Sequence, residues 1–129
     1  MGRGGAPSGR RAAGRQLRLG CPRARSQIVT ALIYCPFPNA ASAEAIGRAL
    51  IEERLVACIN IGSPVRSIFM WEGTVDEGEE APCLLKTSSK LLARAIARLE
   101  DLHPYDTPAI VGWNCDAAGR ATQRWLGAI

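Results

Sequence analysis

The sequence predicts an α+β domain with the order strand, helix, strand, strand, helix, strand, followed by one further helix. Short apolar runs of strand-forming residues alternate with two segments of helical periodicity. Gly, Pro and Asn residues separate these segments, as turn-forming residues do. The chain has 129 residues, 47% of them hydrophobic, which is enough for one domain with its own core.

The first strand is expected at residues 28–35, where the run IVTALIYC is almost continuously apolar. Pro36 and Pro38 are expected to end this strand. Ser42 is expected to cap the first helix, which should end near Arg54. The buried stripe of this helix is formed by apolar residues at helical spacing, namely Ile46, Ala49 and Leu50.

In the middle of the domain the sequence predicts two strand segments, residues 56–61 and 65–71, with a Gly-Ser-Pro bend between them. The acidic, glycine-bearing segment of residues 72–80 is typical of an exposed hairpin tip. A return strand is expected at residues 83–87, with Pro82 at its start, where a strand requires no N–H donor.

A second helix is expected to begin at Ser88 and to end at His103, because the residue before Pro104 disfavours helical geometry. The last strand is predicted at residues 108–115, and a terminal helix at residues 120–126. The second helix has an apolar stripe at helical spacing, formed by Leu91, Leu92, Ala95, Ile96, Leu99 and Leu102.

This order of elements is that of the ferredoxin-like β-α-β-β-α-β sandwich with an extra C-terminal helix. Such a fold places both long helices on one face of an antiparallel sheet and leaves the other face open. Phe69, Trp71 and Trp113 lie on the expected strands, so apolar surface remains for a partner. Free strand edges favour pairing with another chain, and we expect a homotrimer in which three copies cover this surface.

Charge divides the chain into a leader, residues 1–27, and a body, residues 28–129. The leader holds seven arginines and no acidic residue, and it lacks the apolar pattern of a folding segment, so we expect it to be disordered. A non-structural extension, an organelle transit peptide and a nucleic-acid-binding arm stay open for it. The body is mildly acidic, and no apolar run approaches the roughly 20 residues of a membrane span, so neither nucleic acid nor a membrane is an expected partner.

The five cysteines are widely spaced and form no C-x-x-C pair: Cys21, Cys35, Cys58, Cys83 and Cys115. This spacing disfavours a zinc ribbon or a disulfide framework, and it fits a reducing compartment. Burial is expected for the thiols that lie in apolar strands. The sequence has no glycine-rich phosphate loop, H-E-x-x-H or G-x-S-x-G, so we expect no enzyme activity and name no catalytic residue.

A series of short motifs along the body resembles the CutA family of divalent-cation tolerance proteins. In chain order these are Tyr34-Cys35, Pro38, Ala41-Ser42-Ala43, the segment ERLVACIN at residues 53–60, Trp71-Glu72-Gly73, Lys86-Thr87, His103-Pro104-Tyr105, Thr107-Pro108 and Trp125-Leu126. Each motif is short, and their joint order makes the resemblance specific. The leader lies outside it.

The resemblance implies a CutA-like ferredoxin fold for residues 28–129, a homotrimer and a cytoplasmic location, or an organellar one if the leader is a transit peptide. It also implies weak binding of copper or another divalent metal, and no organic cofactor. The implied metal ligands are Cys35 and His103. Leu102 stands where the family carries a further histidine, and Ala109 where it often carries Glu, so this chain has fewer ligands.

Other interpretations stay open beside the metal site. Cys35 is alternatively a packed thiol, and His103 alternatively a residue that ends a helix. A PII-like small-ligand-binding regulatory module is the alternative function, by analogy of fold alone. An RNA-binding domain of similar strand order is disfavoured because the body lacks the required aromatic run.

Overall fold

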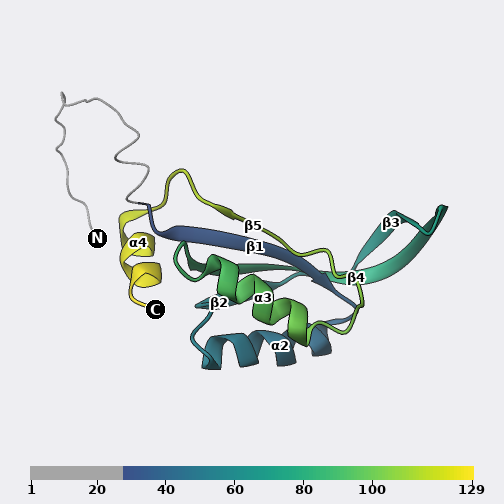
Figure 1. Ribbon diagram of the computed structural model, residues 1–129, viewed down its shortest axis with the longest axis horizontal. Coiled ribbons are helices and arrows are strands. Elements are labelled where there is room, and N and C mark those ends of the chain that lie inside the picture. Colours follow the sequence, from purple (N-terminus) through teal and green to yellow (C-terminus); the bar gives the residue numbers. More distant parts are fainter. Residues whose placement is uncertain (1–27) are drawn as a thin grey trace.

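The computed structural model describes residues 28–129, and its sheet and helices confirm the α+β class (Figure 1). The leader of residues 1–27, with its expected disorder, lies outside the described residues. The elements are, in chain order, β1 (Thr30–Phe37), α2 (Ala40–Glu52), β2 (Cys58–Ile61), β3 (Val65–Trp71), β4 (Thr74–Ser88), α3 (Leu92–Leu102), β5 (Val111–Asn114) and α4 (Arg120–Gly127).

The sheet has the strand order β2-β4-β1-β5, with β3 pairing only with β4, and the pairs are antiparallel. Alternate residues of β1 point to one face, where α2 and α3 lie over the sheet (Figure 1). The core between the sheet and these helices includes Ile33, Cys35, Phe37, Leu50, Leu85 and Leu99, all buried. Most of the expected apolar stripes contribute to this core: Ile46 and Leu50 of α2, and Leu92, Ala95, Ile96, Leu99 and Leu102 of α3. Ala49 is only half-buried, and Leu91 precedes α3.

The first strand continues beyond its expected end, through Pro36 to Phe37, and Pro36 lies opposite Pro82 of β4. The Pro36 carbonyl accepts a hydrogen bond from His103, and the Pro82 carbonyl accepts one from the Gly62 N–H at 2.8 Å. The backbone polar groups of the two prolines thus point away from each other. Because neither proline has to donate to the facing strand, both fit within strands. The expectation that one proline ends a strand and the other begins one is therefore wrong.

The acidic segment of residues 72–80 is mostly strand rather than a hairpin tip. β4 begins at Thr74, and its residues up to Glu80 pair with β3. The turn is formed by Glu72 and Gly73, with φ of 49° and 85°, as in a two-residue hairpin turn with positive φ at both positions. Figure 1 shows this β3–β4 hairpin projecting beyond the rest of the sheet.

Two helix starts differ from expectation. The Asn39 side chain accepts a hydrogen bond from the Ser42 N–H at 2.8 Å, so Asn39 caps α2 and Ser42 lies inside it. α3 begins at Leu92, because Ser88 is still the last residue of β4. The end of α3 is confirmed, since His103 follows it as the C-cap in an extended conformation.

The face of the sheet away from α2 and α3 is open over much of its area, and its exposed large side chains include Tyr34, Val111 and Trp113. At the end where β1 begins, the side chain of Gln123 in α4 accepts hydrogen bonds from the Val29 N–H and the Thr30 hydroxyl. None of the helices described within residues 28–129 is long and apolar enough to cross a membrane.

Candidate metal site

Cys35 lies in β1 with its side chain on the helix-covered face, where it is fully buried. The pKa of its thiol is raised from 9.0 to about 12. Burial is the largest cause of this rise, and the charges of the neighbouring Cys83 and Glu80 are smaller ones. The thiol donates to the carbonyl oxygen of Pro36, with 3.5 Å between sulfur and oxygen. Releasing this proton costs about 4 kcal/mol more than in an exposed cysteine. At neutral pH the side chain is therefore a packed, protonated thiol.

His103 is held by two hydrogen bonds at the carboxyl end of α3. Its Nδ1 accepts from the Tyr105 N–H at 3.2 Å, so this nitrogen carries no proton. The proton is consequently on Nε2, which donates to the Pro36 carbonyl at 2.9 Å. The ring is 7% exposed and stacks on Phe37, with 4.8 Å between ring centroids. Both nitrogens of the imidazole thus already have hydrogen-bond partners.

The two residues predicted as ligands meet at one atom. The Pro36 carbonyl oxygen accepts from both the Cys35 thiol and the His103 ring. The chain achieves this because β1 runs through Pro36, while α3 ends at the point where the ring can reach the same oxygen. The structure therefore brings the predicted pair together, and a metal ion between them would have to displace both hydrogens.

Two further residues of this region were not predicted as site residues. The Tyr105 hydroxyl donates to the Glu80 carboxylate at 3.0 Å. Burial and this bond raise the pKa of Tyr105 to about 12. Glu80 is only half-buried, and it stands where β4 leaves the projecting hairpin and enters the main sheet. The sequence predicts a solvated hairpin tip for this carboxylate, and only the pairing of β4 puts it beside the tyrosine.

Cys83 lies directly opposite Cys35 in the antiparallel pairing of β1 and β4, and it is buried as expected. Cys58 and Cys115 are only half-buried, so the expected burial is wrong for those two thiols. The four cysteines within residues 28–129 are all free thiols. Buried and half-buried residues alternate along residues 81–87, and this alternation puts Cys83 on the core face.

The two positions that depart from the family pattern lie beside this region. Leu102 packs against the hydrophobic core, so an apolar contact takes the place of an added ligand. Ala109 is exposed. Within residues 28–129 no group of three or more His, Cys, Asp or Glu side chains is arranged to hold a metal ion. The ligands predicted from the sequence are therefore the pair Cys35 and His103, with no third ligand grouped beside them in this part of the chain.

The comparisons with known proteins agree on one family. The family model described as CutA1 divalent ion tolerance protein matches residues 31–128. The divalent-cation tolerance protein CutA of Pyrococcus horikoshii is 37% identical over 95 residues, covering 74% of this chain and 92% of that protein. The crystal structure of CutA1 from Ehrlichia chaffeensis is 32% identical with a TM-score of 0.74, covering 78% and 94% of the two chains.

A third relative is the structure of the periplasmic divalent cation tolerance protein CutA from Archaeoglobus fulgidus. It is 30% identical with a TM-score of 0.72, covering 77% of this chain and 96% of that one. The fold and the Cys35–His103 region define a small α+β protein with an antiparallel sheet covered on one face. Within that class the chain belongs to the CutA family of divalent-cation tolerance proteins, and the resemblance seen in its motifs is confirmed.

Proposed function

We propose that this protein is a non-catalytic, trimeric divalent-cation tolerance protein that binds copper or another divalent metal weakly. The observation that carries the metal binding is the meeting of the Cys35 thiol and the His103 imidazole at the Pro36 carbonyl. Thiolate and imidazole are ligands that copper favours. The chain's position in the CutA family, through residues 31–128, supports the same role.

Weak affinity follows from the state of these ligands. The Cys35 thiol must lose a proton whose pKa burial raises to about 12. The His103 ring must give up one of its two hydrogen bonds before a nitrogen lone pair becomes free. Both steps cost free energy and therefore lower the affinity for the metal.

Homotrimer formation is supported by unpaired surface. β3 pairs on one side only, and the exposed hairpin carries Ile68, Met70 and Val75, each at least 65% exposed. The strand order β2-β4-β1-β5, with the two long helices on one face, also supports a ferredoxin-like fold with its other face open. Three copies arranged about one axis would cover the open face and extend the strand edge.

The cellular location is proposed to be the cytoplasm, or an organelle if residues 1–27 act as a transit peptide. The free thiols of Cys35, Cys58, Cys83 and Cys115 support a reducing compartment. The relative from Archaeoglobus fulgidus is called periplasmic, so fractionation of cells that express the full chain is the direct test.

Copper titration of the full chain tests the metal role, beside Cys35→Ser and the matched variant Cys115→Ser, which changes a half-buried thiol outside the site. We expect binding by wild type and by Cys115→Ser, and a loss of binding in Cys35→Ser. Equal binding by wild type and Cys35→Ser would show that the Cys35 thiol is only packed, and would overturn this assignment.

A further inference from the structure

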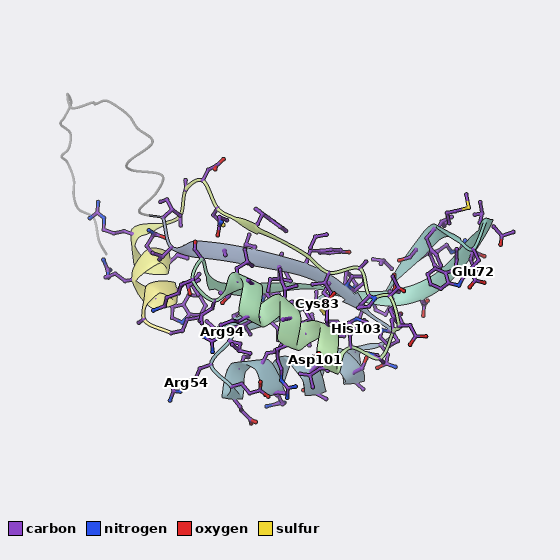
Figure 2. All side chains as sticks on the ribbon, viewed as in Figure 1. Arg54, Glu72, Cys83, Arg94, Asp101 and His103 are labelled. Carbon is purple, nitrogen blue, oxygen red and sulfur yellow. The ribbon has the colours of Figure 1, made fainter. Side chains whose placement is uncertain are left out.

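We propose that Cys35 and Cys83 together form a two-sulfur site for monovalent copper, with Cys83 rather than His103 as the second ligand. This inference rests on the proposed copper binding at Cys35, and it replaces His103 by Cys83 as the second ligand. Figure 2 labels Cys83 on β4 and His103 at the end of α3, both near the base of the β3–β4 hairpin.

The first support is the register of the sheet. Cys35 and Cys83 are direct partners in the antiparallel ladder, so their side chains leave the same face of the sheet. The carbonyls of the following Pro36 and preceding Pro82 point away from each other, toward His103 and Gly62. Because backbone groups alternate in direction along a strand, the two cysteines form a hydrogen-bonded pair, whose Cα atoms are typically about 5.5 Å apart.

A Cα spacing of about 5.5 Å suits both a disulfide and a bridging ion, so the Cβ atoms decide between them. Metal–thiolate bonds of about 2.3 Å, as in zinc sites, would hold two sulfurs roughly 4.6 Å apart on opposite sides of an ion. Directly opposed Cβ atoms in a sheet are about 4.5–5.5 Å apart, so the ion needs little strand movement. A disulfide requires Cβ atoms only about 3.8 Å apart, and hydrogen bonds on each side resist that approach.

The surroundings favour a soft, singly charged ion. Both cysteines are at most 1% exposed and lie in the core with Ile33, Phe37 and Leu85. Such a site excludes water and offers no hard oxygen ligand in the required number for a divalent ion such as magnesium or calcium. Two thiolates are the ligands that select monovalent copper among the common metals. Binding would release the two thiol protons to the buffer and leave one net negative charge spread over copper and sulfur.

The histidine is less available than the second thiol. His103 uses Nδ1 and Nε2 in hydrogen bonds to Tyr105 and Pro36, and freeing either would leave a buried backbone group unpaired. The Cys83 thiol contributes a long contact of 3.7 Å to the Ala81 carbonyl, which is a weak bond for sulfur to give up.

The test starts from a full chain in which Cys21, Cys58 and Cys115 are replaced by Ser, so that the pair alone remains. This background is titrated anaerobically with monovalent copper held by a competing chromophoric chelator. We expect one copper per chain, and a loss of affinity of at least about tenfold on adding either Cys83→Ala or Cys35→Ala.

X-ray absorption of the copper-loaded background gives a readout that does not depend on variants that fold poorly. Two sulfur ligands per copper support the pair, whereas one sulfur and one nitrogen overturn it. Unchanged copper affinity in Cys83→Ala also overturns it. So does a disulfide between Cys35 and Cys83, which mass spectrometry would show as a copper-free chain that has lost two hydrogens. If Cys35→Ala loses copper and Cys83→Ala does not, this inference fails and the proposed metal role survives. If wild type takes up no copper in either oxidation state, both fail.

Discussion

At the scale of single residues, the Pro36 carbonyl ties the candidate site together. It accepts hydrogen bonds from the His103 ring at 2.9 Å and from the Cys35 thiol at 3.5 Å. The ring in turn orders the segment after α3, because its Nδ1 accepts from the Tyr105 N–H. The single histidine of the chain is therefore a structural link between β1 and the loop after α3.

Replacing this histidine should destabilise the fold. His103→Ala removes both ring hydrogen bonds and leaves a cavity against Phe37, which should lower the free energy of unfolding by about 3 kcal/mol. His103→Gln should cost less, because its amide can still donate to Pro36. Chemical denaturation at fixed protein concentration measures both, and an unfolding midpoint of His103→Ala equal to wild type would contradict this role.

The buried thiol of Cys35 predicts a loss of stability at alkaline pH. Its pKa is about 12 in the folded protein against 9.0 as the reference, so the folded state favours the protonated form. This contribution is complete below about pH 9 and declines by about 1.4 kcal/mol per pH unit between the two pKa values.

Unfolding at about pH 8 and about pH 10 tests this, since wild type should lose about 1.4 kcal/mol more than Cys35→Ala between them. The difference between the two proteins isolates Cys35 from Tyr105 and Cys83, whose pKa values burial also raises. Parallel pH profiles for wild type and variant would contradict a buried protonated thiol.

At the scale of elements, the strands and helices could be predicted in type and order, but the register could not. Apolar periodicity is local, and it placed the core face of α3 correctly. Register depends on the alignment of two distant segments, and it decides that Pro36 faces Pro82 and that Cys35 faces Cys83. The prolines therefore look like strand ends in the sequence and are strand interiors in the fold. The residues that meet at the site were predictable in part, while their hydrogen-bonded state was not.

The extent of the β3–β4 hairpin could not be predicted from the sequence either. Its β4 half is acidic and exposed on both faces, so it lacks the one-sided apolar alternation that identifies a strand. Backbone pairing with β3 makes it a strand all the same. The sequence therefore predicts a turn over residues 72–80, whereas the structure confines the turn to Glu72 and Gly73.

The turn can be tested with two glycines of this hairpin. Gly73 has a φ of 85°, and a side chain there would strain the backbone although nothing lies within 4 Å. Gly73→Ala should lower the free energy of unfolding by about 1 kcal/mol. Gly78→Ala is the matched control, because Gly78 has equally open space without a positive φ, and it should be neutral or slightly stabilising. Equal effects of the two substitutions on Tm would contradict this account of the turn.

At the scale of the whole molecule, the described residues leave much apolar surface uncovered. Trp71 at the end of β3 and Trp125 in α4 are each 46% exposed, which makes them a matched pair at different places on the surface. The proposed trimer uses the hairpin, so Trp71→Ala should shift the full chain toward smaller species in light scattering at micromolar concentration. Trp125→Ala should leave the assembly intact. Dissociation by Trp125→Ala alone would place the interface elsewhere.

Native mass spectrometry of the full chain, recorded with and without copper, tests the central claim most directly. It reports the number of chains and the number of bound metal ions together. A trimeric, copper-binding protein has the mass of three chains in both conditions, with the added mass of copper after copper is supplied. A single-chain mass that takes up no copper would contradict it.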